Sequence, residues 1–115
     1  RDGFEEVTGT KDKCKYSQEL TSTGDVVQTV SGNPNAIGYA SVASVGDTVK
    51  MVSVEGVSPT TESIQDGKYK VQRNFVLVTK KDTALSKAAQ EFFDFATSEQ
   101  ADSLITEAGA VPVKR

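Results

Sequence analysis

The chain has 115 residues, of which 37% are hydrophobic and 25% charged, the composition of a single ordinary globular domain. Its formal net charge is −3 at pH 7, which argues against a nucleic-acid-binding surface. An anion ligand stays open, because backbone N–H groups, hydroxyls and one arginine hold a buried anion whatever the net charge of the protein.

Enzymatic chemistry finds little support in the residue types. There is no histidine, so neither a catalytic triad nor a histidine–metal site exists, and the single Cys14 has no base partner. The sequence also has no glycine-rich phosphate loop and no calcium-loop spacing of acidic residues. We therefore expect no enzyme, no metal site and no cofactor.

The first part of the chain predicts two short helices joined by a polar loop. One helix begins at Asp2, whose carboxylate suits the positive end of the helix dipole. The lysine run Lys11–Lys15 is expected to lie in a solvated loop. A second helix is predicted over Thr23–Val30, with Ser22 or Thr23 as its cap and three valines on one face.

The middle of the chain predicts strands. A turn at Gly32–Asn35 stops the second helix. The apolar run Ala36–Ala40 has strand length, and its Gly38 allows a helix or loop to approach the backbone closely. Val42–Val45 is either one turn of helix or a continuation of the strand. The alternation in Val49–Val57 predicts a further strand.

The next helix and the longest strand follow. Ser58 is expected to cap a short helix, with Pro59 at its first position, and Asp66 with Gly67 closes it. Phe75–Val78 then forms the centre of the longest predicted strand.

Helical spacing of apolar residues continues from Ala84 to Ala108, with a break at Ser98–Gln100. The phenylalanines of this stretch are expected to be core residues rather than a stacking platform: Phe92, Phe93 and Phe95. Gly109 ends the last helix, and Val111–Val113 is a short edge strand. Alternating helices and strands without internal repeats predict an α/β fold.

Several stretches carry a resemblance to a known family. They are RDGFEE at Arg1–Glu6, VVQTVSGNPNAIGYASVASV at Val26–Val45, RNFVLVTK at Arg73–Lys80, AQEFFDFAT at Ala89–Thr97 and GAVPVK at Gly109–Lys114. In this order they resemble successive pieces of the substrate-binding proteins that serve phosphate ABC importers. The pieces are a helix start after a Gly-Ser-Gly-Thr loop, a helix with an NPxAIGY strand, a strand crossing between two lobes, and the closing helices with a G-x-x-P strand.

The resemblance implies a three-layer α/β lobe of a type II periplasmic-binding-protein fold, of which this chain is a fragment. Residues 1–66 would be a second-lobe portion, and residues 67–115 the hinge-crossing strand and C-terminal helices. The implied function is extracytoplasmic capture of inorganic phosphate for an ABC permease in the membrane. The full-length protein is expected at the cell surface or in the periplasm, anchored as a lipoprotein.

The resemblance also suggests phosphate-binding residues, each with a plainer alternative. Arg1, following the anion loop, would hold phosphate oxygens with its guanidinium fork, or it is an exposed arginine. Asp2 would accept a proton from phosphate, or it is a favourable charge on the first helical turn. Ser22 and Thr23 would donate hydrogen bonds to the anion, or they only cap the second helix.

Alternatives to phosphate transport stay open at this point. Another tetrahedral oxyanion, such as sulfate or molybdate, is one of them. A signalling or adhesion module that kept the fold and lost the ligand is another. An exposed apolar patch on such a fragment also favours a homodimer.

Overall fold

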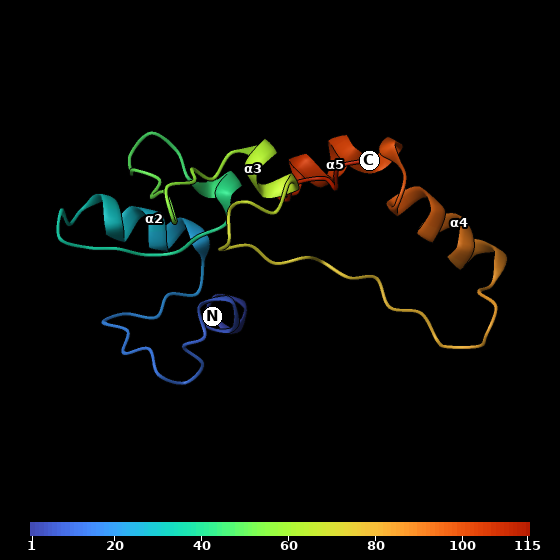
Figure 1. Cartoon of the computed structure of the whole chain (residues 1–115), viewed down its shortest axis with the longest axis horizontal. Helices are drawn as coiled ribbons and strands as arrows, with labels where there is room; N and C mark the ends of the chain where they lie inside the picture. The colour runs from blue at the N-terminus through green and yellow to red at the C-terminus, as the bar shows by residue number, and fades with distance from the viewer.

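A computed structural model describes all residues from 1 to 115, and its regular structure is helical (Figure 1). Each helix predicted from the sequence is confirmed, within a few residues at its ends. The elements in chain order are α1 (Asp2–Thr8), α2 (Thr23–Ser31), the 3-10 turn η1 (Val42–Ser44), α3 (Thr61–Gln65), α4 (Lys87–Ala96), the 3-10 turn η2 (Glu99–Ala101) and α5 (Asp102–Glu107).

Side-chain hydroxyls start three of these helices. Ser22 accepts a hydrogen bond from the Asp25 N–H at the start of α2, at 3.1 Å. Ser86 accepts one from the Ala89 N–H at the start of α4, at 3.3 Å. Such caps satisfy N–H groups that have no partner inside the helix.

The cap of α3 differs from the prediction. Thr60 is the cap, and it forms a capping box with Ser63. Ser58, the predicted cap, lies two residues before Thr60. Its hydroxyl shares a hydrogen bond with the Ser53 hydroxyl, and its carbonyl accepts one from the Ser63 hydroxyl. The predicted cap was therefore wrong by two residues.

Glycine ends three helices in the same way. After α1, α3 and α5 the glycine has a positive φ, and two backbone hydrogen bonds cross back to the last turn. After α5 the bonds run from the Gly109 N–H to the Thr106 carbonyl and from the Ala110 N–H to the Ile105 carbonyl, each at 3.0 Å. This is the Schellman pattern, and it confirms Gly109 as the predicted end.

The strand predictions are wrong. The chain has one isolated β-bridge, between Val54 and Val57, and no sheet. Ala36–Ala40, Phe75–Val78 and Val111–Val113 lie in segments without regular secondary structure. A strand needs a neighbouring backbone to bond, and these segments do not pair with one another. The predicted three-layer α/β lobe is therefore not confirmed by this structure.

One local expectation about the middle segment is confirmed. A side chain added at Gly38 would meet Val26 Cγ1 at 3.0 Å and Val30 Cγ2 at 3.1 Å. Gly38 therefore lets the segment approach the valine face of α2, as predicted. The open choice at Val42–Val45 is decided in favour of a helical turn, η1.

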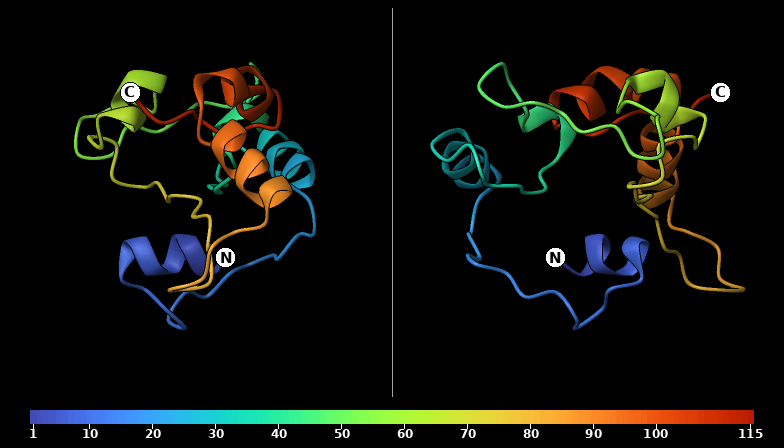
Figure 2. Two further views of the ribbon diagram at one scale, coloured as in Figure 1. Left: turned by 90° about the vertical axis from the view of Figure 1, so that its right-hand side faces the viewer. Right: turned by 60° about the vertical axis from the view of Figure 1, so that its left-hand side comes forward.

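The chain leaves an unusually large area uncovered. Its accessible surface is 9189 Å², whereas a compact protein of 12.3 kDa exposes about 6,100 Å². The radius of gyration is 17.0 Å, against about 13 Å for a compact domain of this length. Figure 1 shows why: the segment that precedes α4 runs alone across an open space, and Figure 2 shows that α1 lies apart from the other helices.

Few side chains are buried as a result. Only Ala101 and Glu5 are buried, so the chain has no continuous hydrophobic core. The predicted core position of the α4 phenylalanines is wrong for this chain, since Phe92 is 66% exposed and Phe95 is 40% exposed. None of the helices has the length and apolar character needed to cross a bilayer.

The Gly109→Ala variant tests the helix end. Gly109 has φ 90, and an added Cβ would lie 3.3 Å from the Ala43 Cβ. We expect a loss of about 1–2 kcal/mol in the free energy of unfolding, measured by thermal melting in circular dichroism, because an L-residue is strained at this φ. Gly46→Ala is the matched control, since its added Cβ would meet no atom within 4 Å. An equal loss in the two variants would contradict this account.

Candidate functional site

The best-organised polar group of the chain surrounds the carboxylate of Glu5 on α1. Arg1 Nε and the Tyr16 hydroxyl each donate to Glu5 Oε1, both at 2.9 Å. The backbone N–H of Asp12 donates to Glu5 Oε2 at 2.9 Å. The Glu5 residue is only 1% exposed. A buried carboxylate is stable only when such donors satisfy it, and here three do.

These donors hold Glu5 in its ionised form. The Asp12 N–H, the Arg1 guanidinium and the Tyr16 hydroxyl, in that order, lower the pKa of Glu5 from 4.5 to about 2, against the opposing effect of desolvation. The pKa of Tyr16 is raised, first by a polar contact with the Tyr39 side chain and next by burial, with Cys14 and Glu5 adding to the effect. Glu5 is therefore a fixed negative charge, and Tyr16 a fixed donor, at neutral pH.

Aromatic contacts extend this group to the middle of the chain. The rings of Phe4 and Tyr39 stack with centroids 4.1 Å apart and an interplanar angle of 7°. Tyr16 meets Tyr39 edge-on at 6.1 Å, and the Arg1 guanidinium lies 5.3 Å from the centre of the Tyr16 ring. We call the five residues Arg1, Phe4, Glu5, Tyr16 and Tyr39 the N-terminal cluster. It connects α1, the loop that follows α1 and the segment that follows α2 in the sequence.

Arg1, the first predicted phosphate ligand, is engaged inside this cluster. Its Nη1 donates to both oxygens of Glu19, at 3.1 and 3.2 Å, while its Nε is held by Glu5. These two carboxylates raise the pKa of Arg1, with the Glu5 hydrogen bond the larger cause. Only Nη2 donates no hydrogen bond within the chain. An oxyanion approaching Arg1 would meet two negative charges next to one positive charge.

The other predicted ligands lie at the starts of two helices. Asp2 is exposed in the first turn of α1, as its plainer alternative describes. Ser22 uses its hydroxyl to cap α2, and Thr23 beside it is half-buried. No hydrogen bond joins Arg1 or Asp2 to Ser22 or Thr23. Glu19, three residues before Ser22, forms an ion pair with Arg1 and so connects the two regions along the chain.

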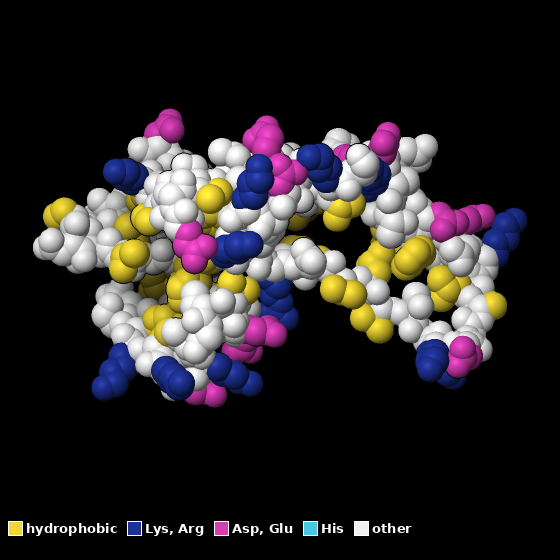
Figure 3. All heavy atoms as spheres, viewed as in Figure 1, with side chains coloured by type: hydrophobic (Ala, Val, Ile, Leu, Met, Phe, Trp, Pro, Cys, Tyr) yellow, Lys and Arg dark blue, Asp and Glu magenta, His cyan; other side chains and the backbone are white.

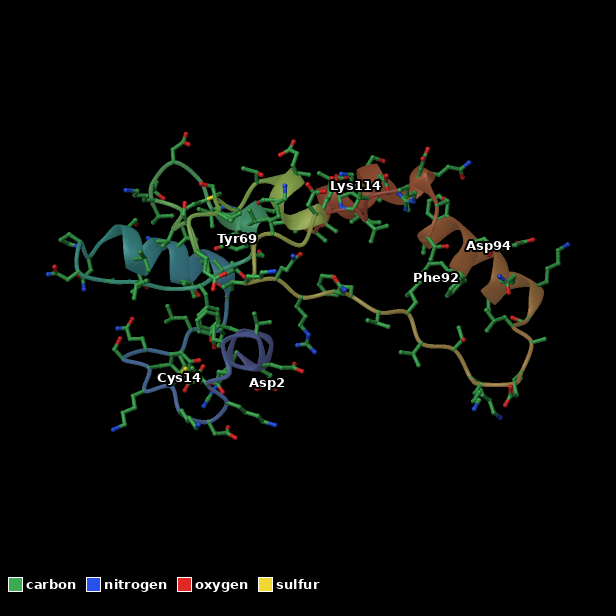
Figure 4. The ribbon with its side chains drawn as sticks, in the orientation of Figure 1. Asp2, Cys14, Tyr69, Phe92, Asp94 and Lys114 are labelled. Atoms are coloured by element: carbon green, nitrogen blue, oxygen red, sulfur yellow. The ribbon has the colours of Figure 1, made fainter.

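The lysines of the loop after α1 are solvated, whereas its cysteine is half-buried. Lys11, Lys13 and Lys15 are exposed and form no ion pair, in agreement with the predicted solvated loop. Cys14 is half-buried, and its Sγ lies 3.1 Å from the Thr10 hydroxyl. Figure 4 shows Asp2 and Cys14 together in the N-terminal part, well apart from Phe92 on α4.

Two of the hollows on the surface lie away from the N-terminal cluster. A polar one of about 390 Å³ is lined by Ile64, Gln65, Asp66, Gly67, Gln72 and Asn74. An apolar one of about 190 Å³ lies between the extended segment and α4, lined by Leu77, Val78, Thr79, Leu85, Ala89, Phe92 and Phe93. Neither contains a predicted phosphate ligand.

Sequence reasoning missed the central residue of the N-terminal cluster. The spacing of Arg1 and Glu5, four residues apart on a helix, is a signal for an ion pair and was available. Tyr16 and Tyr39 carry no such local signal, because their contacts depend on how the loops fold back onto α1.

Comparison with known proteins shows that the chain is similar to a segment of bacterial phosphate-binding proteins. It is 34% identical over 116 residues to the phosphate-binding protein PstS 2 of Streptococcus pneumoniae, covering 93% of this chain and 39% of that protein. It is 30% identical over 123 residues to PstS 2 of Streptococcus agalactiae, covering 98% and 42%. It is 29% identical over 112 residues to PstS of Borreliella burgdorferi, covering 91% and 40%.

The resemblance seen in the sequence is therefore confirmed: the chain is related over nearly its whole length to a segment of the phosphate-binding proteins PstS. It spans about two fifths of the length of these relatives. The relatives are binding proteins by name, in line with the prediction that the chain is not an enzyme. No family model and no solved structure matches the chain.

The N-terminal cluster is expected to weaken in acid. The folded-state pKa of Glu5, about 2, lies below its ordinary value of 4.5, so the unfolded chain takes up the proton at higher pH. The contribution of Glu5 to stability is thus complete above about pH 5 and falls as the pH drops toward 2. NMR signals of the Tyr16 and Tyr39 rings, followed against pH, measure the loosening.

The Glu5→Gln variant should abolish this pH dependence and loosen the cluster at neutral pH, because a neutral amide cannot pair with Arg1. Glu6→Gln removes the same charge from an exposed neighbour on α1 and should leave the tyrosine signals unchanged. Tyrosine signals that respond to acid equally in the wild-type and Glu5→Gln chains would contradict the assignment.

Proposed function

We propose that this chain is part of an extracytoplasmic solute-binding protein that captures inorganic phosphate and delivers it to an ABC permease. The observation that carries the proposal is the similarity over 91–98% of the chain to proteins named phosphate-binding protein in three bacterial species. The full-length protein would work outside the cytoplasmic membrane, held there by a lipid anchor.

The proposed division of the chain follows from the family resemblance of its sequence, which implies two lobes. Residues 1–66 would form second-lobe material, and residues 67–115 would supply a hinge-crossing strand and the C-terminal helices. The isolation of the extended segment supports this division, because residues 73–80 form no backbone hydrogen bond with the rest of the chain. Lobe closure about this segment would bury phosphate and create the surface that the permease recognises.

The proposed ligand contacts are Arg1, Asp2, Ser22 and Thr23. At α2 the free N–H groups of the first turn and the helix dipole favour an anion beside Ser22. Arg1 would offer Nη2, since Glu5 and Glu19 occupy its Nε and Nη1. Asp2 would accept a hydrogen bond from a protonated phosphate oxygen, which sulfate cannot supply at neutral pH.

An NMR titration of the amide signals with phosphate tests this proposal, with sulfate and molybdate as the competing ligands. We expect phosphate-selective shifts at Arg1–Phe4 and at Ser22–Gly24. Shifts with sulfate or molybdate instead would transfer the proposal to another oxyanion. A folded chain that responds to none of the three would contradict these four residues as a ligand site.

The Ser22→Asp variant sharpens the test. Aspartate caps a helix as well as serine does, so α2 should persist, while the added charge repels phosphate. We expect the phosphate dissociation constant to rise by roughly tenfold or more. Ser86→Asp adds the same charge at the matching cap of α4 and should leave binding unchanged. An equal change in the two variants would remove Ser22 from the site.

A further inference from the structure

The guanidinium of Arg1 is held on several sides by residues of the chain itself. Glu5 Oε1 accepts a hydrogen bond from Nε at 2.9 Å, and Cζ lies 5.3 Å from the centre of the Tyr16 ring. Both oxygens of Glu19 accept from Nη1, at 3.1 and 3.2 Å. The terminal nitrogens Nη1 and Nη2 form the end of the guanidinium that binds two oxyanion oxygens in parallel. A carboxylate of the chain therefore already occupies one half of this end.

The two carboxylates hold Arg1 with unequal strength. The side chain of Glu5 is 1% exposed, and its oxygens accept three hydrogen bonds. The side chain of Glu19 is 62% exposed, and Arg1 is its only hydrogen-bond partner. An exposed ion pair contributes little in water and exchanges with solvent and ions, whereas a buried pair is costly to break. Glu19 can therefore leave Arg1 while Glu5 keeps the guanidinium in place.

The ion pair of Glu19 with Arg1 also fastens the linker between α1 and α2. No backbone group of residues 17–21 forms a hydrogen bond, and the contacts of Glu19 with Arg1 are the only hydrogen bonds that the side chains of this linker make. The linker leads directly to Ser22, which caps α2. Release of Glu19 from Arg1 would therefore free the start of α2 to move relative to Arg1.

The wider surface offers an anion no strong attraction. The formal net charge of the chain is −3. Figure 3 shows acidic side chains among the basic ones over the N-terminal part, at the lower left of the view. The charges in direct contact with Arg1 therefore decide how well this residue attracts an oxyanion.

We propose that Glu19 sets the affinity of the proposed phosphate site, as an internal competitor that occupies Arg1 in the free chain and is displaced by the oxyanion. This inference rests on the proposed role of Arg1 in phosphate binding. The incoming anion takes the place of the Glu19 carboxylate on Nη1 and adds a hydrogen bond from Nη2. The freed linker then allows Ser22 and Thr23, which form no hydrogen bond with Arg1 in the free chain, to approach the same anion.

The Glu19→Gln variant tests the competition. We expect the phosphate dissociation constant of the 115-residue chain to fall roughly threefold to tenfold at low salt, because the anion no longer competes with a negative charge at Nη1. The gain should shrink as the salt concentration rises, since an exposed charge is screened. If Glu19 only fastened the linker, its removal would not tighten binding. Amide NMR titration with inorganic phosphate measures the constants.

Glu6→Gln is the matched control. It removes the same charge from an exposed side chain on α1 that forms no ion pair. We expect its phosphate dissociation constant to stay within about twofold of the wild-type value. Circular dichroism checks that the helices persist in both variants.

The carboxyl carbon signals of the wild-type chain report the displacement itself. Saturation with phosphate should shift the signal of Glu19 and the amide signals of residues 17–21, and leave the carboxyl signal of Glu5 in place. A wild-type chain that binds phosphate no more weakly than Glu19→Gln would overturn the inference and leave the proposed phosphate site standing. Absence of phosphate binding in the wild type and in both variants would overturn the inference and the site together.

Discussion

The order of the N-terminal third depends on one buried carboxylate. Glu5 is the only charged residue that the fold buries, and donors from α1, the following loop and the Tyr16 side chain satisfy it. An unpaired carboxylate in this position would be costly, so α1 and the loop keep their arrangement as long as the donors stay in place. The stacked rings of Phe4 and Tyr39 attach the segment that follows α2 to this arrangement.

This structural role bears directly on the proposed ligand contact at Arg1. Glu5 holds Nε from a buried position, whereas Glu19 holds Nη1 from an exposed one, with 62% of its side chain accessible. The exposed pair is weak in water and exchangeable, and the buried one is firm. An oxyanion would therefore compete with Glu19 for the outer edge of a guanidinium that Glu5 keeps oriented.

The rest of the molecule is defined by what it leaves uncovered. Its helices are short, and isolated helices of 5 to 10 residues gain most of their stability from tertiary packing. Yet the phenylalanine face of α4 and the apolar segment before it lie largely exposed. Relatives more than twice as long as this chain have further residues with which to cover such surfaces.

The helices were predictable because their signals are local. Serine or threonine caps start α2, α3 and α4, and glycines at positive φ end α1, α3 and α5, all decided by residues within one turn. The family resemblance was also readable, since it rests on the order of short motifs. Only the exact cap of α3 was misplaced.

Sheet and core were decided by tertiary structure. Ala36–Ala40 and Phe75–Val78 have the composition of buried strands, but a ladder forms only where a second backbone lies alongside, and none does here. The Glu5 site depends on Tyr16 and Tyr39, which reach it through loops of no predictable course. By itself the sequence determined the features that depend on residues close together in the chain, such as helix caps and helix ends. The fold decided every contact between distant segments, because such contacts depend on which surfaces meet.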